Sequence, residues 1–248
     1  MKTFRPAFAL MGALLLASTF QSCLDDDNDS ISIRYPNALV TVKTSTDNAF
    51  YLQLDDKTTL LPTNLKKSPF GEKEVRALLN FTETNEESKG YSKAVYVNWI
   101  DSILTKPAVP TLSTTEENDA KYGTDPIEIV KDWVTIAEDG YLTLRFSTLW
   151  GGQKTHFINL LTGVNPENPY EVELRHNANG DIADRRGEAL VAFNLKDLPD
   201  TEGKTVKLKI NWQSFSGKKS AEFNFCSRAT TETANMLHGE TEFVTSLE

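Results

Sequence analysis

Cysteine and histidine are scarce in this chain, whose 248 residues include 2 cysteines and 3 histidines. These are the residues that most often form disulfides or bind metal ions in a small domain. Cys23 follows an apolar leader and is expected to be consumed by lipidation, so Cys226 would be the one thiol and no intramolecular disulfide could form. Cys226 ends an alternating pattern typical of a strand, which predicts a small buried hydrophobe rather than a reactive thiol. Packed cores must therefore hold the fold together.

Metal sites have little support. His156, His176 and His238 lack the close spacing of a site built on one element, although the first two could still meet across neighbouring strands. Asn177-Ala178-Asn179-Gly180-Asp181 superficially resembles a calcium loop, but it lacks the longer register and the bidentate Glu. Turn conformation at Asn-Gly explains this segment. We interpret the histidines as structural and expect neither a metal nor another cofactor.

Catalytic motifs are missing as well. There is no Gly-x-Ser-x-Gly elbow, and Ser214-Phe215-Ser216-Gly217 does not imitate one. Carboxylates are plentiful, but a hydrolytic pair is defined by its separation in space, which a sequence does not give. Lys and Arg number 26 against 35 Asp and Glu, and the net charge of -9 repels phosphate backbones. We expect a protein that is not an enzyme and that does not bind nucleic acid.

Apolar residues run together at positions 7–20, behind Lys2 and Arg5. This run is short for a membrane span and fits the core of a signal peptide. It leads into Phe20-Gln21-Ser22-Cys23, which resembles a relaxed lipobox. We predict a signal peptide over residues 1–22 and acyl chains, such as palmitate, on Cys23. The Asp-rich residues that follow resemble a surface-export signal, so the expected location is the outer membrane, lipid-anchored and facing the cell surface.

Past a solvated tether assigned to residues 23–35, alternation of period two predicts half-buried strands. In the first half of the chain the alternating segments are 39–44, 50–54, 75–81 and 94–104. Residues 72–79 could instead form a short helix. Phe81 and Thr82 continue the alternation, so we favour a strand.

The second half is a denser set of strands. Residues 133–137 and 141–146 predict a hairpin across Glu138-Asp139-Gly140, and a second hairpin is predicted between 146–150 and 155–161 across Gly151-Gly152. Further strands are expected at 170–175, 189–195, 206–212 and 221–225. About seven short strands with turns at this spacing indicate a β-sandwich.

A change of composition marks a boundary between two domains. Lys106-Pro107-Ala108-Val109-Pro110 leads into residues 111–125, which are rich in Thr, Glu, Asn and Asp. We place the first domain over residues 36–115 and the sandwich over 116–228, followed by a loosely held tail over 229–248. Cleavage between Thr111 and Asp125 is expected to release two separately folded fragments.

Five short segments carry a family resemblance. They are Leu54-Asp55-Asp56-Lys57-Thr58-Thr59-Leu60-Leu61-Pro62, Ile103-Leu104-Thr105-Lys106-Pro107, Leu149-Trp150-Gly151-Gly152, Leu174-Arg175-His176-Asn177-Ala178-Asn179-Gly180-Asp181 and Ala192-Phe193-Asn194-Leu195. In order and spacing they resemble the NigD-like family of lipoproteins, over about residues 36–228. The resemblance implies an all-β chain, with an N-terminal OB-like barrel followed by a C-terminal immunoglobulin-like β-sandwich. The family name derives from a gene linked to a bacteriocin, which implies an immunity role, and the family has no known catalytic residues.

Together these inferences predict a non-enzymatic, surface-exposed lipoprotein that binds a partner, with bacteriocin immunity implied by the family resemblance alone. The alternatives are a glycan-binding accessory lipoprotein, a surface hydrolase of unknown substrate, and a structural subunit of a surface assembly. The expected partners are the membrane, through the lipid anchor, and an unidentified protein or glycan.

One ligand contact is predicted, at the loops of the second half. Trp150 stands beside Gly151-Gly152, and the loop at 176–187 carries Asn177, Asn179, Asp181, Arg185 and Arg186. An exposed aromatic beside a polar loop is the usual composition of a protein- or sugar-contacting patch. Trp150 could instead cap the sandwich core, with both arginines solvated. We favour the core interpretation of Trp150.

Overall fold

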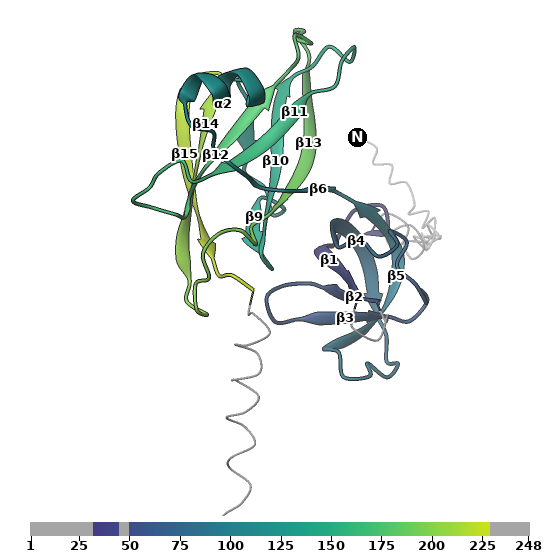
Figure 1. Cartoon of the computed structure of the whole chain (residues 1–248). Helices are drawn as coiled ribbons and strands as arrows, with labels where there is room; N and C mark the ends of the chain where they lie inside the picture. Colours follow the sequence, from purple (N-terminus) through teal and green to yellow (C-terminus); the bar gives the residue numbers. More distant parts are fainter. Residues whose placement is uncertain (1–31, 45–49, 229–248) are drawn as a thin grey trace, which may run out of the picture.

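The computed structural model of the chain describes residues 32–44 and 50–228. The predicted signal peptide, Cys23 with its acidic neighbours, and the tail at 229–248 lie outside these residues. Regular structure in the described part is almost all β, arranged as a barrel followed by a sandwich (Figure 1), which confirms the predicted fold class. None of the helices in these ranges is long and apolar enough to span a bilayer.

Five strands close into the barrel, in the order β1-β2-β3-β5-β4. They are β1 (Ala38–Thr44), β2 (Phe50–Gln53), β3 (Thr59–Pro62), β4 (Val75–Glu83) and β5 (Lys93–Ser102). Strand β4, for which a helix was the alternative, pairs antiparallel with both β1 and β5. Because β3 and β5 run parallel, the connectivity is that of a small Greek-key barrel rather than an up-and-down one.

Alternation along the barrel strands decides which side chains fill the interior. Val40, Leu52 and Leu79 are fully buried in one apolar cluster inside the barrel. The opposite face of β1 is also closed to solvent, since Leu39 and Thr41 are buried as well. That second face packs against the sandwich, so a strand whose pattern is typical of half-burial is buried on both sides.

Two five-stranded sheets form the sandwich. The β10 sheet has the order β6-β13-β10-β8, with β9 also on β10, and the β12 sheet has the order β15-β14-β12-β11-β7. The strands of the β10 sheet are β6 (Leu104–Pro107), β8 (Glu128–Val130), β9 (Ile136–Glu138), β10 (Tyr141–Leu149) and β13 (Arg186–Asn194). Those of the β12 sheet are β7 (Val109–Pro110), β11 (Phe157–Thr162), β12 (Glu171–Asn177), β14 (Val206–Ser214) and β15 (Gly217–Phe225).

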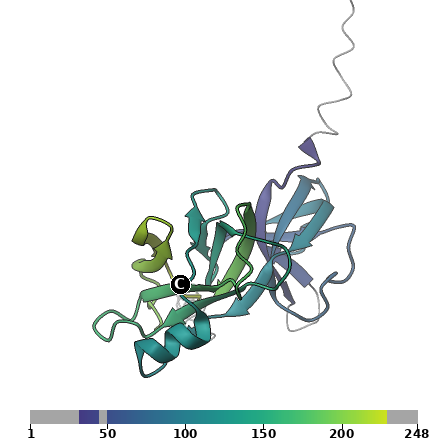
Figure 2. The same cartoon turned by 90° about the horizontal axis from the view of Figure 1, so that it is seen from above.

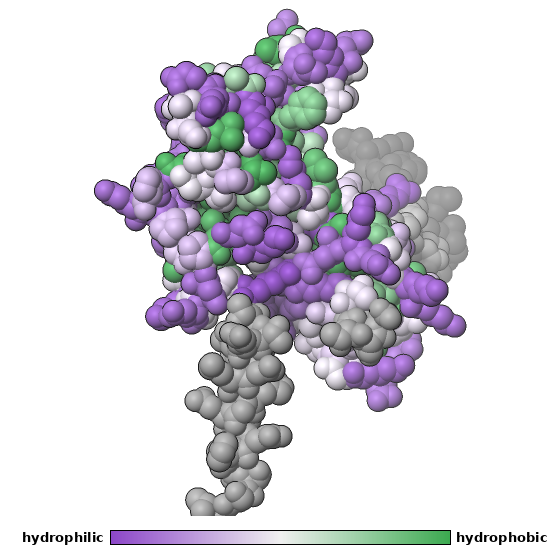
Figure 3. Space-filling view, viewed as in Figure 1, coloured by the Kyte–Doolittle hydropathy of each residue, from purple (hydrophilic) through white to green (hydrophobic). Residues whose placement is uncertain are grey.

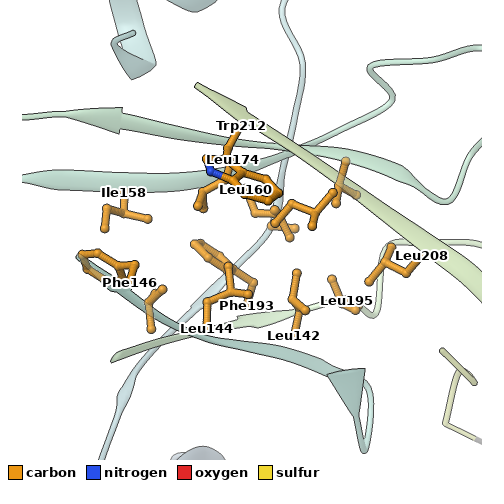
Figure 4. Packing of buried hydrophobic residues seen from close by; sticks show 14 of the residues in the cluster. Leu142, Leu144, Phe146, Ile158, Leu160, Leu174, Phe193, Leu195, Leu208 and Trp212 are labelled. Atoms are coloured by element: carbon orange, nitrogen blue, oxygen red, sulfur yellow. The ribbon is translucent and has the colours of Figure 1, made fainter. Parts of the chain in front are cut away.

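Inward-facing side chains of the two sheets meet in a single core (Figure 4). Leu144 and Phe193 from the β10 sheet face Leu160 and Leu174 from the β12 sheet, and all four are buried. Trp212 joins them, as the alternating pattern of residues 206–212 predicts. Outside this core, hydrophilic residues cover most of the face that Figure 3 shows.

Of the two predicted hairpins, one is confirmed and one is wrong. Strand β9 pairs antiparallel with β10, and Asp139 and Gly140 both have positive φ, at 49° and 72°. In contrast, β10 and β11 belong to different sheets, so residues 150–156 cross the end of the sandwich instead of closing a hairpin. A period-two pattern specifies the faces of a strand and not its partner, and for this reason it did not distinguish the two connections.

Sheet pairing passes from the barrel to the sandwich at Ile103, well before the boundary placed at residue 115. Strand β6 pairs in parallel with β13, and β7 with β11, so the Pro-flanked segment supplies an edge strand to each sheet. Short edge strands with proline are tolerated because a missing N–H costs no ladder bond on the solvent side.

The polar residues after β7 include a helix, α2 (Thr115–Tyr122), rather than a linker. The Thr114 hydroxyl accepts from the Glu117 N–H, and the Glu117 carboxylate accepts from the Thr114 N–H, which is a capping box. Helix α2 contacts β11 and β12 on the side of the sandwich away from the barrel (Figure 2). Arg175 of β12 holds it there through the Asp119 carboxylate, at 2.6 Å.

The barrel docks on the outer face of the β10 sheet through an apolar cluster that includes Leu39 of β1 and Ala192 of β13. Beside this cluster lies Arg76 of β4, with none of its surface exposed. Its guanidinium donates to the Thr41 hydroxyl at 3.0 Å, to the Thr143 hydroxyl at 3.3 Å and to the Glu138 carboxylate at 3.1 Å.

Burial lowers the pKa of Arg76 and raises that of Glu138, and the attraction between the two groups opposes both shifts. A second set of ion pairs lies nearby, where Asp139 accepts from Lys43 at 2.7 Å and from Arg228 at 3.0 Å. Buried and partly buried charge pairs thus join the two domains.

Candidate functional site

Two loops meet at the end of the sandwich that points away from the barrel in Figure 1. One loop is residues 150–156, between β10 and β11, and the other is residues 178–185, between β12 and β13. Asp181 of the second loop is buried, and its carboxylate accepts from the backbone N–H groups of Gly151 at 3.2 Å, Gly152 at 2.8 Å and Gln153 at 3.1 Å. One side chain therefore fixes the course of the neighbouring loop.

The chemistry of Asp181 follows from this position. Desolvation acts to raise its pKa, but the backbone donors, Gln153 and Gly152 foremost, outweigh it and hold the pKa below its ordinary value. Asp181 therefore stays charged at neutral pH. A side chain at Gly151 would place a Cβ 2.5 Å from an Asp181 carboxylate oxygen, so the clamp requires glycine there.

His156, directly before β11, meets His176 of β12, as the sequence left open. His156 Nδ1 lies 3.0 Å from His176 Nε2, and His156 Nε2 lies 3.4 Å from the Asp181 carboxylate. Burial, followed by the proximity of His156, lowers the pKa of His176, which keeps that ring neutral. Within residues 32–44 and 50–228 no group of three or more His, Cys, Asp or Glu could hold a metal ion.

Trp150 does not cap the core, contrary to the interpretation we favoured. It is 43% exposed and lies outside the sandwich core cluster. The guanidinium of Arg185 lies over its ring, 5.0 Å from the centroid, and a Cβ on Gly187 would be 3.4 Å from the Trp150 side chain. Because the N–H of Trp150 donates to the Arg185 carbonyl at 2.9 Å, the two residues are held side by side.

The next residue in the sequence, Arg186, makes a second pair of this kind. The guanidinium of Arg186 lies 4.7 Å from the centroid of the Phe215 ring, at the turn between β14 and β15. We name Trp150, Arg185, Arg186 and Phe215 the tip patch. Arg–aromatic stacking of this kind is worth roughly 0.5–1 kcal/mol at exposed sites and favours the stacked arrangement in the absence of a ligand.

The six predicted contact residues thus lie at one end of the sandwich, but their roles differ. Asn177 accepts from the N–H of Asn179 at 2.8 Å, and Asn179 has a φ of 54°, so both shape the turn. Asp181 is the internal clamp. Trp150, Arg185 and Arg186 are exposed and available for contact. The predicted lipidation site, Cys23, lies outside the described residues.

Sequence reasoning missed Phe215 and a groove. Phe215 sits in Ser214-Phe215-Ser216-Gly217, where an aromatic at the tip of a tight turn was the available signal. The groove has a volume of about 920 Å³ and lies between α2 and strands β12, β14 and β15. It depends on α2, which the composition did not reveal as a helix.

Charges on the groove floor are largely paired with one another. Glu171 accepts from Asn165, Asn211 and Lys209, and these bonds together lower its pKa. Trp212 also lines the groove, and its buried indole N–H has no hydrogen-bond acceptor among the residues that the structure describes. The groove is therefore lined by polar side chains, most of whose charges are paired.

Fold and site together define a two-domain β-protein in which a small OB-type barrel supports a sandwich with an exposed, pre-ordered loop surface. Residues 39–103 match the NigD-like N-terminal OB domain, and residues 110–225 match the NigD-like C-terminal beta sandwich domain. The chain belongs to the NigD-like family, which confirms the resemblance read from its segments.

Solved structures of other proteins have the same fold. A protein from Parabacteroides distasonis, described as related to a toxin, is 37% identical with a TM-score of 0.63, over 82% of this chain and 97% of that chain. A protein of unknown function, DUF1344, from Bacteroides vulgatus is 21% identical with a TM-score of 0.62, over 79% and 92%. A NigD-like immunity protein from Bacteroides caccae is 22% identical with a TM-score of 0.52, over 75% and 90%. These last two show the fold alone. A search of curated proteins finds no match.

Proposed function

We propose that this protein is a lipid-anchored, non-enzymatic binding protein of the outer membrane that contacts a partner through the tip patch. The observation that carries the proposal is the Trp150–Arg185 pair, exposed on a loop that the buried Asp181 clamps. A surface ordered before binding loses little conformational entropy when it binds. Trp and Arg are also the residues in which binding energy most often concentrates at protein interfaces.

Charge supports a protein partner with acidic groups. The two loops carry Lys154 and Arg185, and Arg186 follows, against Asp181 and Asp184, of which Asp181 is buried, whereas the whole chain carries a net charge of -9. An incoming toxin polypeptide is the first candidate, since one relative is described as related to a toxin and one fold neighbour as a NigD-like immunity protein.

Capture from intact cells tests the contact. The acylated protein is used as bait beside Trp150→Ala and Arg185→Ala, with Tyr96→Ala, which removes a 50% exposed aromatic from the barrel, as the matched control. Both tip variants should lose the partner while the control keeps it. Because Trp150 is half exposed, its removal should cost less than about 1 kcal/mol of unfolding free energy, against the roughly 3–5 kcal/mol typical of a buried Trp. Unchanged capture by both tip variants would contradict the proposal.

The anchor is tested by Cys23→Ala. Acyl chains supply membrane affinity at about 0.8 kcal/mol per buried methylene, so the variant should lose acylation and leave the membrane fraction, or remain an unprocessed precursor. Detergent partitioning and mass measurement of the N-terminal peptide report the outcome. Partitioning equal to that of the wild type would show that Cys23 is not the anchor.

A glycan ligand is the second candidate, and the groove beneath α2 favours it. Amide, carboxylate and lysine side chains line this groove. Sugar hydroxyls can pair with all of these groups. If glycosidase treatment of the cells removes the captured partner while tip variants still bind it, the groove and not the tip patch is the site.

A further inference from the structure

Three large apolar side chains are exposed close to the start of the described chain, where the barrel meets the sandwich. Ile33 is 42% exposed, Tyr35 67% and Trp133 51%. Tyr35 and Trp133 line one groove of about 440 Å³, whose walls are Leu78 of the barrel and Leu190 of the β10 sheet. We name Ile33, Tyr35 and Trp133 the junction patch.

The N-terminal part of the junction patch is fixed to the barrel, although residues 32–35 were assigned to the tether. The Asn80 side chain donates to the Ser32 carbonyl at 2.9 Å and to the Tyr35 carbonyl at 2.6 Å. The indole N–H of Trp99 donates to the Ile33 carbonyl. These bonds hold the backbone that carries Ile33 and Tyr35 in place.

Two carboxylates share one arginine beside the junction patch. Arg145 donates to Asp132, the residue before Trp133, at 2.5 Å and to Glu188 at 2.6 Å. The rim of the groove therefore presents an arginine bonded to two carboxylates, beside the rings of Tyr35 and Trp133. Trp and Tyr with this exposure prefer the headgroup region of a bilayer, where the ring is shielded and the polar atom stays hydrated.

We propose that the junction patch lies in the interfacial zone of the bilayer to which the protein is anchored, an inference that rests on the proposed acylation of Cys23. Eight residues lie between Cys23 and Ser32, a reach of at most about 30 Å when fully extended. Among the described surfaces, the junction patch is the one on which this short connection ends. A membrane contact at this point orients both domains relative to the bilayer, which an acyl chain on a tether does not do by itself.

Tryptophan quenching tests the contact. The full acylated chain is reconstituted in vesicles of phosphatidylethanolamine and phosphatidylglycerol whose acyl chains carry bromine near the headgroup. The chain has 4 tryptophans, and bromine should quench part of their emission. Trp133→Phe should remove most of that quenching. Trp150→Phe is the matched control, because Trp150 is similarly exposed but lies in the tip patch, and it should leave the quenching unchanged.

The outcomes separate this inference from the anchor. If the wild-type chain does not float with the vesicles, the proposed lipid anchor is wrong, and the membrane contact of the junction patch is then wrong as well. Flotation without quenching, or quenching that disappears with Trp150→Phe instead, overturns the junction patch alone. A Tyr35→Ala variant should float as well as the wild type but show weaker quenching of Trp133, since loss of one interfacial ring lets the groove lift from the bilayer.

Discussion

At the scale of single residues, Asp181 has the largest consequence for the tip. Its carboxylate is the common acceptor for three successive backbone N–H groups, so the 150–156 loop has a defined shape without belonging to either sheet. The exposed Trp150 ring and the Arg185 guanidinium over it depend on that shape. A polar residue that never touches a partner would thus determine whether the contact surface exists.

This role predicts a pH dependence. The pKa of Asp181 is lower in the folded chain than in the unfolded one, where it would be about 3.9. The stability that its bonds supply is therefore complete above that unfolded value and is lost as the pH falls through the lower folded value. The backbone amide signals of Gly152 and Gln153 should report a titration midpoint below the ordinary range of aspartate.

Asp181→Asn is the matched variant, since it keeps the shape and removes the charge. It should abolish the titration and speed hydrogen exchange at Gly152 and Gln153, while the amides of β12 keep their protection. A wild-type midpoint at or above the ordinary aspartate value would contradict the clamp. Unchanged exchange in the variant would contradict it equally.

At the scale of elements, strand pairing reassigns the segment between the domains. Strands β6 and β7 belong to the two sandwich sheets, and α2 is capped by Thr114 and bonded to β12 through Arg175. The polar composition of residues 111–125 reflects a short capped helix on a sheet, which buries Asn118 and Tyr122, and not a linker. Cleavage in this segment would therefore cut into the sandwich, although the composition favoured it as the point of separation.

Two fragments test this reassignment. Residues 104–228 retain β6 and β7, whereas residues 116–228 lose an edge strand from each sheet and leave β13 and β11 unpaired on one side. The longer fragment should be soluble and unfold cooperatively. The shorter one should aggregate or unfold at lower denaturant concentration. Equal midpoints for the two fragments in urea would restore the boundary at residue 115.

At the scale of the whole molecule, a buried guanidinium joins barrel and sandwich. Arg76 of the barrel bonds Glu138 and Thr143 of the sandwich with no exposed surface of its own. Buried ion pairs add little net stability over apolar packing. Removing one partner is nevertheless destabilising, because the charge of the other partner is then left uncompensated. The pair therefore specifies the docking geometry of the domains more than it stabilises either of them.

Arg76→Ala should lower the free energy of unfolding by about 3–5 kcal/mol, because Glu138, only 17% exposed, would be left without its partner. The barrel and the sandwich should then melt in separate steps in calorimetry. Lys93→Ala is the control: it breaks an ion pair with Glu83 in which both side chains are largely exposed, and such pairs contribute about 0–1 kcal/mol. A single transition with a loss no larger than that of the control would show that Arg76 does not couple the domains.

The sequence by itself determined the strands and their faces. Alternation at residues 75–81 and 206–212 identified which side chains enter a core, because successive side chains of a strand point to opposite faces whatever its partner. Asp139-Gly140 and Asn179-Gly180 identified turns, since few residue pairs adopt positive φ at both positions. The family, and with it the barrel and sandwich, followed from short segments in a particular order.

Only the tertiary structure decided partners and exposure. The pattern of β10 and β11 could not tell a hairpin from a crossing between sheets, because pairing depends on where distant strands lie. The sequence pattern of β4 does not predict a buried Arg76, which is buried because the sandwich covers it. Trp150, which we expected in the core, is exposed on the loop that Asp181 holds in place. The burial of a side chain belongs to the assembled surfaces around it, and these come from segments that the sequence places far apart.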